Sequence, residues 1–482
     1  MHHAYLPQDN SITTITTMKS STYIESISLD IASLQAGYAD GSFSPVDVVA
    51  EVYRRIDARG QDYVWTALTD REDALQDAQD LLAVDSDSYA LWGIPFSVKD
   101  NIHVKGLPTT ASCPAFSHLP EDSAVVVKKL IAAGAILIGK NTMDQFATGL
   151  VGVRSEGHPV NSFNPDYIPG GSSSGSGIAV AVGLVSFSLG SDTGGSGRIP
   201  AALNNIVGLK PTPGLISTQG MIYANRSFDC VPIFALTCTD AKWVFDQAAG
   251  PDINDPFLRE KQQASNNVPL SFNQLVVGIP DIENRQFFGD SLAEQCFNDA
   301  IARLRAMGAE VREIDFSHFV EAGKMLFDGP LLAERYSALE SFLERNPNDV
   351  NSNVKSIVEK AKQYSAVDLC KEYYRITELK ALTRGVFSNI DILMVPTAAT
   401  IYRIDEILSD PVNLNTNMGY YTYYANILQL SAIAVPAAIR EDGLPFGICF
   451  LAGPQDDASL AALGRIWQQS TNLLPGDNAR FR

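Results

Sequence analysis

Two glycine- and serine-rich stretches stand close together in this chain. Residues 170–177 are Gly-Gly-Ser-Ser-Ser-Gly-Ser-Gly, and residues 190–200 are Gly-Ser-Asp-Thr-Gly-Gly-Ser-Gly-Arg-Ile-Pro. Taken singly, the first is typical of a flexible loop and the second of a turn. The first stretch lacks the lysine of a GxxxxGK[ST] phosphate loop and the GxGxxG spacing after a strand, so nucleotide binding is not indicated.

An upstream lysine connects these loops with nucleophilic catalysis. Lys99 ends the apolar run 94–98, a position that by itself is typical of a surface residue. A serine hydroxyl needs a base, and the chain shows no suitable neighbouring histidine for a Ser-His-Asp mechanism. A buried lysine can be that base, because desolvation lowers its pKa. A second serine can relay the proton, and N–H groups at a Gly-Gly turn can hold an oxyanion.

The three segments together resemble the amidase signature family, whose members are serine hydrolases with a Ser–cis-Ser–Lys triad. The family places a GGS-x-R-x-P turn at a fixed distance after a GGSS-type loop, followed by a G-x-K-P-T strand. Here 196 − 172 = 24 residues separate the two serines, and residues 208–212 are Gly-Leu-Lys-Pro-Thr. The resemblance implies that Ser196 is the nucleophile, Ser172 the cis-peptide relay and Lys99 the base.

The same resemblance assigns roles to the other residues of these loops. Asp192 and Arg198 are expected to brace the turn, and Lys210 is expected to be structural. The oxyanion would be held by the N–H groups of Thr193, Gly194, Gly195 and Ser196.

Further stretches are similar to one branch of the family, the allophanate hydrolases, which act on a small carboxylated urea. They are residues 45–49, 53–55, 144–152, 204–208, 329–336 and 442–447. The resemblance implies that Arg335 binds the substrate carboxylate, since a guanidinium binds a carboxylate through two parallel hydrogen bonds. Phe327 stands where a tyrosine normally assists this arginine. Gly149 matches a backbone contact in the substrate pocket.

Phe327 keeps a second substrate class open. A site that recognises a polar group of its substrate through hydrogen bonds discriminates less well between substrates when one of its hydrogen-bonding residues is absent. An amidase or carbamate hydrolase for a neutral amide is therefore the alternative. A third interpretation is the glutaminase component of a tRNA-amidating complex, which the stretches above fit less well. A non-catalytic binding protein is disfavoured, because all three triad positions are intact.

The composition restricts the partners of the chain. Of 482 residues, 45% are hydrophobic, and 36 Lys and Arg against 55 Asp and Glu give a net charge of −19. Such acidity disfavours nucleic acid and anionic membranes, and no apolar stretch reaches the roughly 18 residues of a membrane span. The cysteines and histidines form no metal-binding pattern. We therefore expect a cytoplasmic enzyme with a small-molecule substrate and with neither cofactor nor metal. The resemblance also implies that the chain forms a homodimer.

Strand-like and helical patterns alternate along the chain, which predicts an α/β architecture. The resemblance implies the amidase signature fold, a large mixed twisted sheet covered by helices on both faces. We expect a flexible tail over residues 1–22 and one domain over residues 23–482. A helix should start at Ser44-Pro45 and end at Gly60. Strands are expected at 94–98, 135–138, 185–189, 276–279, 310–314, 390–395 and 433–439, and helices at 71–82, 124–133, 292–307, 320–344, 367–387 and 458–469.

Overall fold

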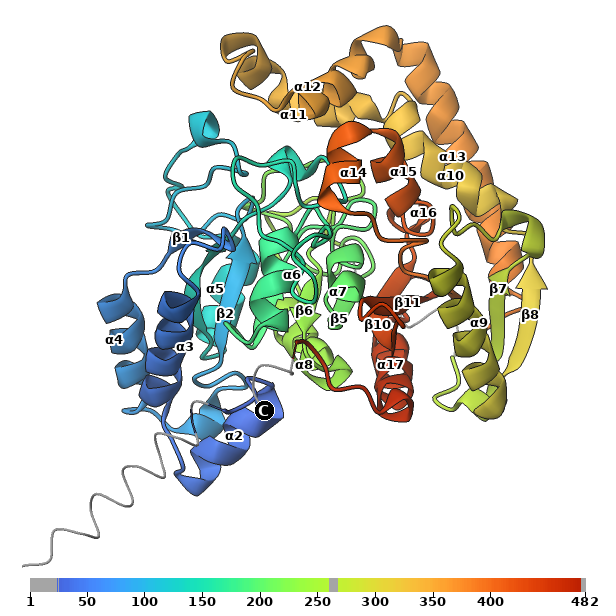
Figure 1. Ribbon diagram of the computed structural model, residues 1–482. Helices are drawn as coiled ribbons and strands as arrows, with labels where there is room; N and C mark the ends of the chain where they lie inside the picture. Colours follow the sequence, from blue (N-terminus) through green and yellow to red (C-terminus); the bar gives the residue numbers. More distant parts are fainter. Residues whose placement is uncertain (1–23, 25, 260–267, 478–482) are drawn as a thin grey trace, which may run out of the picture.

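The computed structural model describes residues 24, 26–259 and 268–477, so the expected tail of residues 1–22 lies outside the described part. Its centre is an eleven-stranded sheet with the order β1-β3-β2-β4-β6-β5-β10-β11-β9-β7-β8 (Figure 1). Parallel and antiparallel pairs both occur, which confirms the predicted α/β class with a large mixed sheet. The strands are β1 (Trp65–Leu68), β2 (Pro95–Lys99), β3 (Ile136–Asn141), β4 (Phe187–Leu189), β5 (Val207–Lys210), β6 (Ile233–Ala235), β7 (Val276–Pro280), β8 (Glu310–Ile314), β9 (Ile392–Pro396), β10 (Ser431–Ile439) and β11 (Pro445–Ala452).

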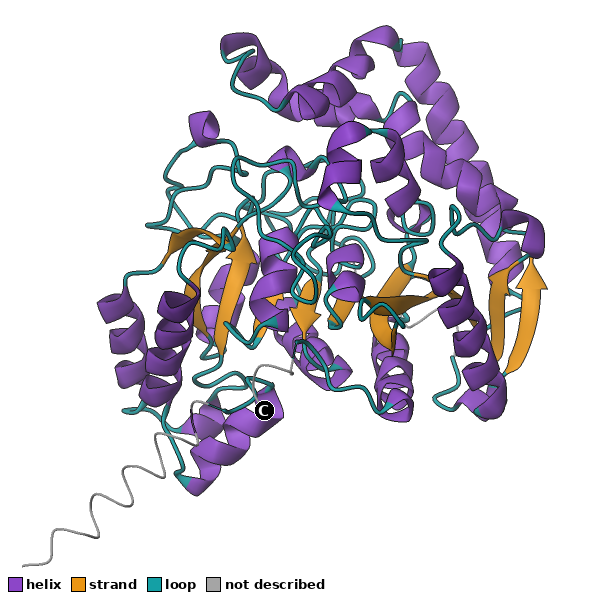
Figure 2. Ribbon diagram, viewed as in Figure 1, coloured by secondary structure: helices purple, strands orange, loops and turns teal. Residues whose placement is uncertain are grey.

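Helices surround this sheet (Figure 2). They are α2 (Ile31–Asp40), α3 (Pro45–Arg59), α4 (Arg71–Leu81), α5 (Val125–Ala132), α6 (Ser174–Ala181), α7 (Ile199–Leu203), α8 (Cys238–Ala248), α9 (Ser291–Ala306), α10 (Ser317–Asp328), α11 (Leu332–Arg345), α12 (Ser352–Glu359), α13 (Ala366–Phe387), α14 (Ile404–Ser409), α15 (Asn413–Met418), α16 (Tyr424–Ile427) and α17 (Asp457–Thr471). None of the described helices is long and apolar enough to cross a membrane.

The two faces of the sheet are covered by different helices. A Cβ on Gly208 of β5 would lie 2.8 Å from the Cβ of Ala201 in α7, and Gly208 pairs with Ala434 of β10. A Cβ on Gly464 of α17 would lie 3.2 Å from Cδ1 of Ile433, the next residue in β10. Because successive strand residues point to opposite faces, α7 and α17 cover opposite faces.

Local sequence signals account for several element boundaries. α3 begins with the predicted Ser44-Pro45 start, where Ser44 Oγ accepts the Asp47 amide at 3.3 Å and Asp47 Oδ2 accepts the Ser44 amide at 2.8 Å. This reciprocal cap satisfies two amides that the first helical turn leaves free. The single helix expected over residues 320–344 is wrong, because the chain forms α10 and α11 instead. Pro330 lies between them, and proline cannot continue a helix.

The parallel strands bring the two glycine-rich loops to one edge of the sheet. β2 pairs in parallel with both β3 and β4. Lys99 is the last residue of β2, residues 190–198 follow β4, and residues 170–173 precede α6. Carboxyl ends of neighbouring parallel strands are where α/β proteins place their ligands. The fold therefore brings these segments together although they lie far apart in the sequence.

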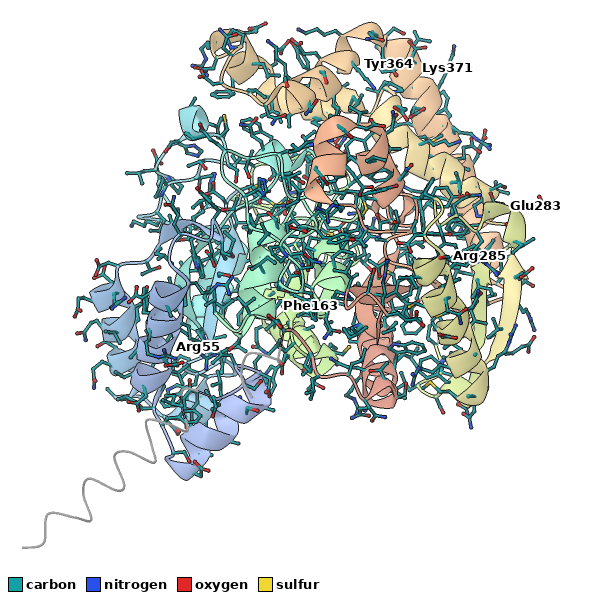
Figure 3. All side chains as sticks on the ribbon, in the orientation of Figure 1. Arg55, Phe163, Glu283, Arg285, Tyr364 and Lys371 are labelled. Atoms are coloured by element: carbon teal, nitrogen blue, oxygen red, sulfur yellow. The ribbon has the colours of Figure 1, made fainter. Side chains whose placement is uncertain are left out.

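A group of helices, α10 to α13, lies above these loops (Figure 1). Tyr364 and Lys371 lie on the outer side of this group of helices (Figure 3). Phe342 of α11 packs edge-on against Phe116 at 5.1 Å and in a tilted arrangement against Phe146 at 5.7 Å between ring centroids. These aromatic contacts hold α11 against the loops that follow β2 and β3.

Candidate active site

Three polar side chains from separate segments meet at the carboxyl end of β2. Lys99 Nζ donates a hydrogen bond to Ser172 Oγ at 2.7 Å, and Ser172 Oγ donates to Ser196 Oγ at 2.9 Å. The Gly171–Ser172 peptide bond is cis. Lys99 and Ser172 have no exposed surface, whereas Ser196 keeps 4%. The chain of contacts therefore ends at the hydroxyl that a substrate can reach.

Burial controls the charge of Lys99. It lowers the pKa of the Lys99 ammonium from 10.5 to about 7, because the charged form loses its hydration. The carboxylates of Asp144, Asp192 and Asp229 raise this pKa, and Arg335 lowers it, each by less than burial does. At pH 7 about half of the Lys99 side chains are therefore neutral and able to accept a proton.

Ser191 is a partner of Lys99 that the sequence patterns did not single out. Lys99 Nζ donates to Ser191 Oγ at 2.9 Å, and Asn101 Nδ2 donates to the same oxygen at 3.1 Å. Two serine oxygens thus hold the Lys99 amine in place, and Asn101 fixes one of them. The only signal in the sequence was the position of Ser191 inside the second glycine-rich stretch.

A buried ion pair braces the turn that carries Ser196. Arg198 Nε and Nη2 donate to Asp192 Oδ2 and Oδ1 at 3.1 and 3.0 Å. The same carboxylate accepts the amides of Gly195 and Gly197, both at 2.9 Å. Asp192 and Arg198 have no exposed surface. These contacts agree with the structural role expected for both residues, since removing either would leave the other as an uncompensated buried charge.

These contacts also correct the expected set of oxyanion donors. The Gly195 amide already donates to Asp192, so it is not free for a substrate oxygen. Within the described part of the chain, the amides of Thr193, Gly194 and Ser196 have no acceptor. Three of the four expected donors therefore remain available.

Arg335 brings a buried positive charge to the site from α11. Its Nη1 donates to Thr148 Oγ1 at 2.7 Å and to the Ala147 carbonyl oxygen at 3.2 Å, and Nη2 donates to Asn225 Oδ1 at 3.1 Å. All of these partners are neutral, and Nε has no hydrogen-bond partner among the described residues. Burial lowers the pKa of Arg335 to about 10, and Asp229 acts in the opposite direction. A buried cation whose direct hydrogen-bond partners are neutral is suited to binding an anion.

Aromatic contacts connect Arg335 with the Ser196 turn. Arg335 Cζ lies 5.1 Å from the Phe327 ring centroid, and Phe327 lies 4.9 Å from the Tyr423 ring. A Cβ on Gly194 would lie 2.8 Å from Cδ1 of Tyr423, so only glycine lets the turn approach this ring. Arg335 and the turn are therefore linked through these two rings. Tyr423 carries no motif of its own, so the sequence contains no signal for it.

Gly149 lies on the segment that Arg335 contacts. Arg335 binds the Thr148 hydroxyl, and Arg154 Nη1 donates to the Thr148 carbonyl oxygen at 2.9 Å. A Cβ on Gly149 would lie 2.7 Å from Asp144 Oδ2. This close packing explains the glycine, and a contact between Gly149 and the substrate stays a prediction.

Comparison with known proteins assigns this chain to a family. The profile of the amidase family matches residues 47–461. The chain belongs to this family. Among its amidase relatives, urea amidolyase of Saccharomyces cerevisiae is 40% identical over 425 residues, which are 87% of this chain and 23% of that protein. This chain therefore spans less than a quarter of that relative's length.

Two other amidase-family matches cover more of the relative. A glutamyl-tRNA(Gln) amidotransferase component of Bacillus thuringiensis is 31% identical over 461 residues, covering 89% of this chain and 94% of that protein. The solved structure of Kluyveromyces lactis allophanate hydrolase superposes with a TM-score of 0.86 at 34% identity. It covers 92% of this chain and 72% of that chain.

Proposed function

We propose that this chain hydrolyses an amide bond of allophanate, or of a close carboxylated urea, and releases ammonia. The observation that carries the proposal is Arg335, a fully buried guanidinium with neutral hydrogen-bond partners that is linked to the Ser196 turn through the rings of Phe327 and Tyr423. Similarity to an allophanate hydrolase and a urea amidolyase supports the same substrate class. A homodimer and a cytoplasmic location remain predictions.

The hydrogen-bonded chain supplies the proton transfers of the proposed reaction. Neutral Lys99 takes a proton from Ser172 as Ser172 takes the proton of Ser196, and the Ser196 oxygen attacks the amide carbon. The carbonyl electron pair becomes an oxyanion, which the amides of Thr193, Gly194 and Ser196 stabilise.

Collapse of this intermediate breaks the carbon–nitrogen bond. The departing nitrogen takes the proton back from Lys99 through Ser172 and leaves as ammonia. Water then attacks the acyl-enzyme by the same relay, and Ser196 regains its proton as the acid product leaves.

Phe327 favours a second candidate function. Its ring lies beside Arg335 and provides no hydroxyl to a bound carboxylate. A neutral small amide would not need that hydroxyl, and an apolar ring contributes to its binding by burial of surface.

The test of the proposed function is ammonia release by the purified protein from four separate substrates: allophanate, biuret, glutamine and a simple aryl amide. Biuret is the informative comparison, because it carries a neutral amide where allophanate carries a carboxylate. Fast release from allophanate alone would support the proposal. Release only from neutral amides would reject the carboxylated substrate and favour the second candidate.

Arg335→Met should lower kcat/KM for allophanate by about 100-fold, because charge-assisted hydrogen bonds contribute about 3 kcal/mol together. Turnover of biuret should change much less. The control is Arg55→Met, which removes another buried guanidinium, that of α3, which donates to Glu51, Gly183 and Ile27 (Figure 3). That variant should lose stability and keep its preference for allophanate. Equal losses on both substrates in Arg335→Met would reject carboxylate recognition by Arg335.

The pH dependence of kcat/KM should report the deprotonation of Lys99. Because the base acts in its neutral form and burial sets its pKa at about 7, the rate should rise with pH and level off above this value. Below it, each pH unit should lower the rate about tenfold. Initial rates from pH 5.5 to 10 measure the midpoint. A rate that still rises near pH 10 would show that Lys99 keeps its ordinary pKa.

A further inference from the structure

A buried carboxylate, Asp229, contacts the turn that carries Ser196. It accepts the hydroxyl of Thr193, whose amide is one of the three free donors. It also accepts the Ala224 amide at 2.7 Å and the Asn225 amide at 3.2 Å. Asp229 thus joins the oxyanion turn to the backbone of residues 224–229.

The same short segment reaches the other end of the site. Asn225 Oδ1 accepts Arg335 Nη2 at 3.1 Å, and Asn225 Nδ2 donates to the Leu331 carbonyl oxygen at 2.9 Å. The Asn225 carbonyl oxygen accepts the amides of Phe228 and Asp229, both at 2.9 Å, which closes the turn. Hydrogen bonds therefore run from Thr193 through Asp229 and Asn225 to Arg335 without a gap.

We propose that Asp229 is a positioning residue that sets the distance between Arg335 and the oxyanion turn at Thr193. The inference rests on the proposed function. In allophanate only one nitrogen separates the carboxylate from the amide carbonyl, so the cation and the oxyanion donors must stand at one fixed spacing. A carboxylate shared by the Thr193 hydroxyl and the Asn225 amide holds that spacing, because neither partner can move without breaking a buried hydrogen bond.

Because Asp229 is charged, its role can also be tested through its effect on the pKa of Lys99. Asp229 raises the pKa of Lys99, as Asp144 and Asp192 do, while Arg335 lowers it. Burial raises the pKa of Asp229 itself to about 6, so most of it is ionised at pH 7. Other titratable groups near Asp229 are Tyr223 and Cys230, and three more line a cavity with it, namely Arg226, Asp255 and Arg259.

The experiment compares three variants with wild-type protein on allophanate and biuret over pH 5.5–10. Asp229→Asn removes the charge, and Thr193→Val removes the hydroxyl that lowers the pKa of Asp229 but keeps the carboxyl group. The matched control is Asp240→Asn: Asp240 is also buried with a raised pKa, but it lies in α8 and is not among the charges that act on Lys99. Melting temperature and the amplitude of a single-turnover burst report the folded, active fraction.

Asp229→Asn should lower kcat for allophanate about 10- to 100-fold per active site, less than complete loss of an oxyanion donor costs. Its preference for allophanate over biuret should fall. The acid limb of the pH–rate profile, the part in which the rate rises with pH, should move to lower pH, because the ammonium of Lys99 loses a favourable charge. Thr193→Val should reproduce the loss of kcat and move the limb less than Asp229→Asn does, because the carboxyl group stays, although its pKa rises without the hydroxyl. Asp240→Asn should keep kcat, preference and limb.

A purely structural carboxylate would give a different pattern. Asp229→Asn would then lower the melting temperature or the active fraction, with kcat, preference and acid limb of the remaining enzyme unchanged, and this would overturn the proposal. Full activity of Thr193→Val would overturn it as well, even if Asp229→Asn failed to fold. Wild-type protein that turns over only biuret would reject the proposed function. In that case, a shift of the acid limb measured for Asp229→Asn with biuret would still support the link between Asp229 and the turn that carries Ser196.

Discussion

Ser196→Ala is expected to lower kcat for ammonia release by about 10⁴- to 10⁶-fold, the range found when a nucleophilic serine is removed from a hydrolase. Ser196 is the only member of the hydrogen-bonded trio with exposed surface, so no other hydroxyl of the trio can take its place. The fold should survive, because the variant loses one hydrogen bond, that from Ser172, which contributes about 1 kcal/mol. Ammonia release and thermal melting measure the two effects.

Ser176→Ala is the matched control for this variant. Ser176 is also fully buried, and its hydroxyl donates to the Leu189 carbonyl oxygen at 3.2 Å, away from Lys99. It should keep nearly normal kcat at a similar cost in stability. The double variant Ser172→Ala with Ser196→Ala should be no slower than Ser196→Ala, because residues that act as one unit are not additive. Substantial turnover by Ser196→Ala would rule out Ser196 as the nucleophile.

Lys99→Met is expected to lower kcat by about 10³- to 10⁴-fold, since positioned proton transfer contributes up to about that much. Methionine keeps the length and apolar character of the side chain, and it removes the amine that contacts Ser172 and Ser191. The rise of the rate around pH 7 should disappear with the group that causes it. A pH–rate profile of the residual activity measures both results.

Lys210→Met separates the loss of a base from the loss of a buried lysine. Lys210 has no exposed surface, and its amine donates to the Pro211 carbonyl oxygen at 2.8 Å. This variant should lose stability and keep the acid limb of the pH profile. A Lys99→Met protein with near-normal rates, or one that retains the limb, would exclude Lys99 as the base.

Much of the fold was predictable because its signals are local. The cap at Ser44, the helix over residues 367–387 and the strand over residues 310–314 each depend on residues next to one another in the chain. The break at Pro330 was also visible in the sequence, and the helical periodicity on both sides concealed it. β11 was missed: it is buried over its whole length and shows no alternation of polar and apolar side chains, and periodicity alone does not distinguish such a strand from a buried helical segment.

Part of the candidate site could likewise be predicted from the sequence, and part of it could not. The lysine and the two serines could be named from their motifs, and the structure places them in one hydrogen-bonded chain. The loss of Gly195 as a donor could not be seen, because it depends on where the Asp192 carboxylate points. Asp229 carries no motif, and its role follows only from its contacts.

The sequence by itself determined which residues are available for chemistry: two glycine-rich loops, two serines 24 positions apart and an upstream lysine. Only the tertiary structure decided what these residues can do. Lys99 and Ser172 are 73 positions apart, and Arg335 and Thr148 are 187 apart, yet each pair is in hydrogen-bond contact. The pKa values of Lys99 and Arg335 depend on burial by distant segments. Desolvation acts through space and leaves no local pattern in the chain.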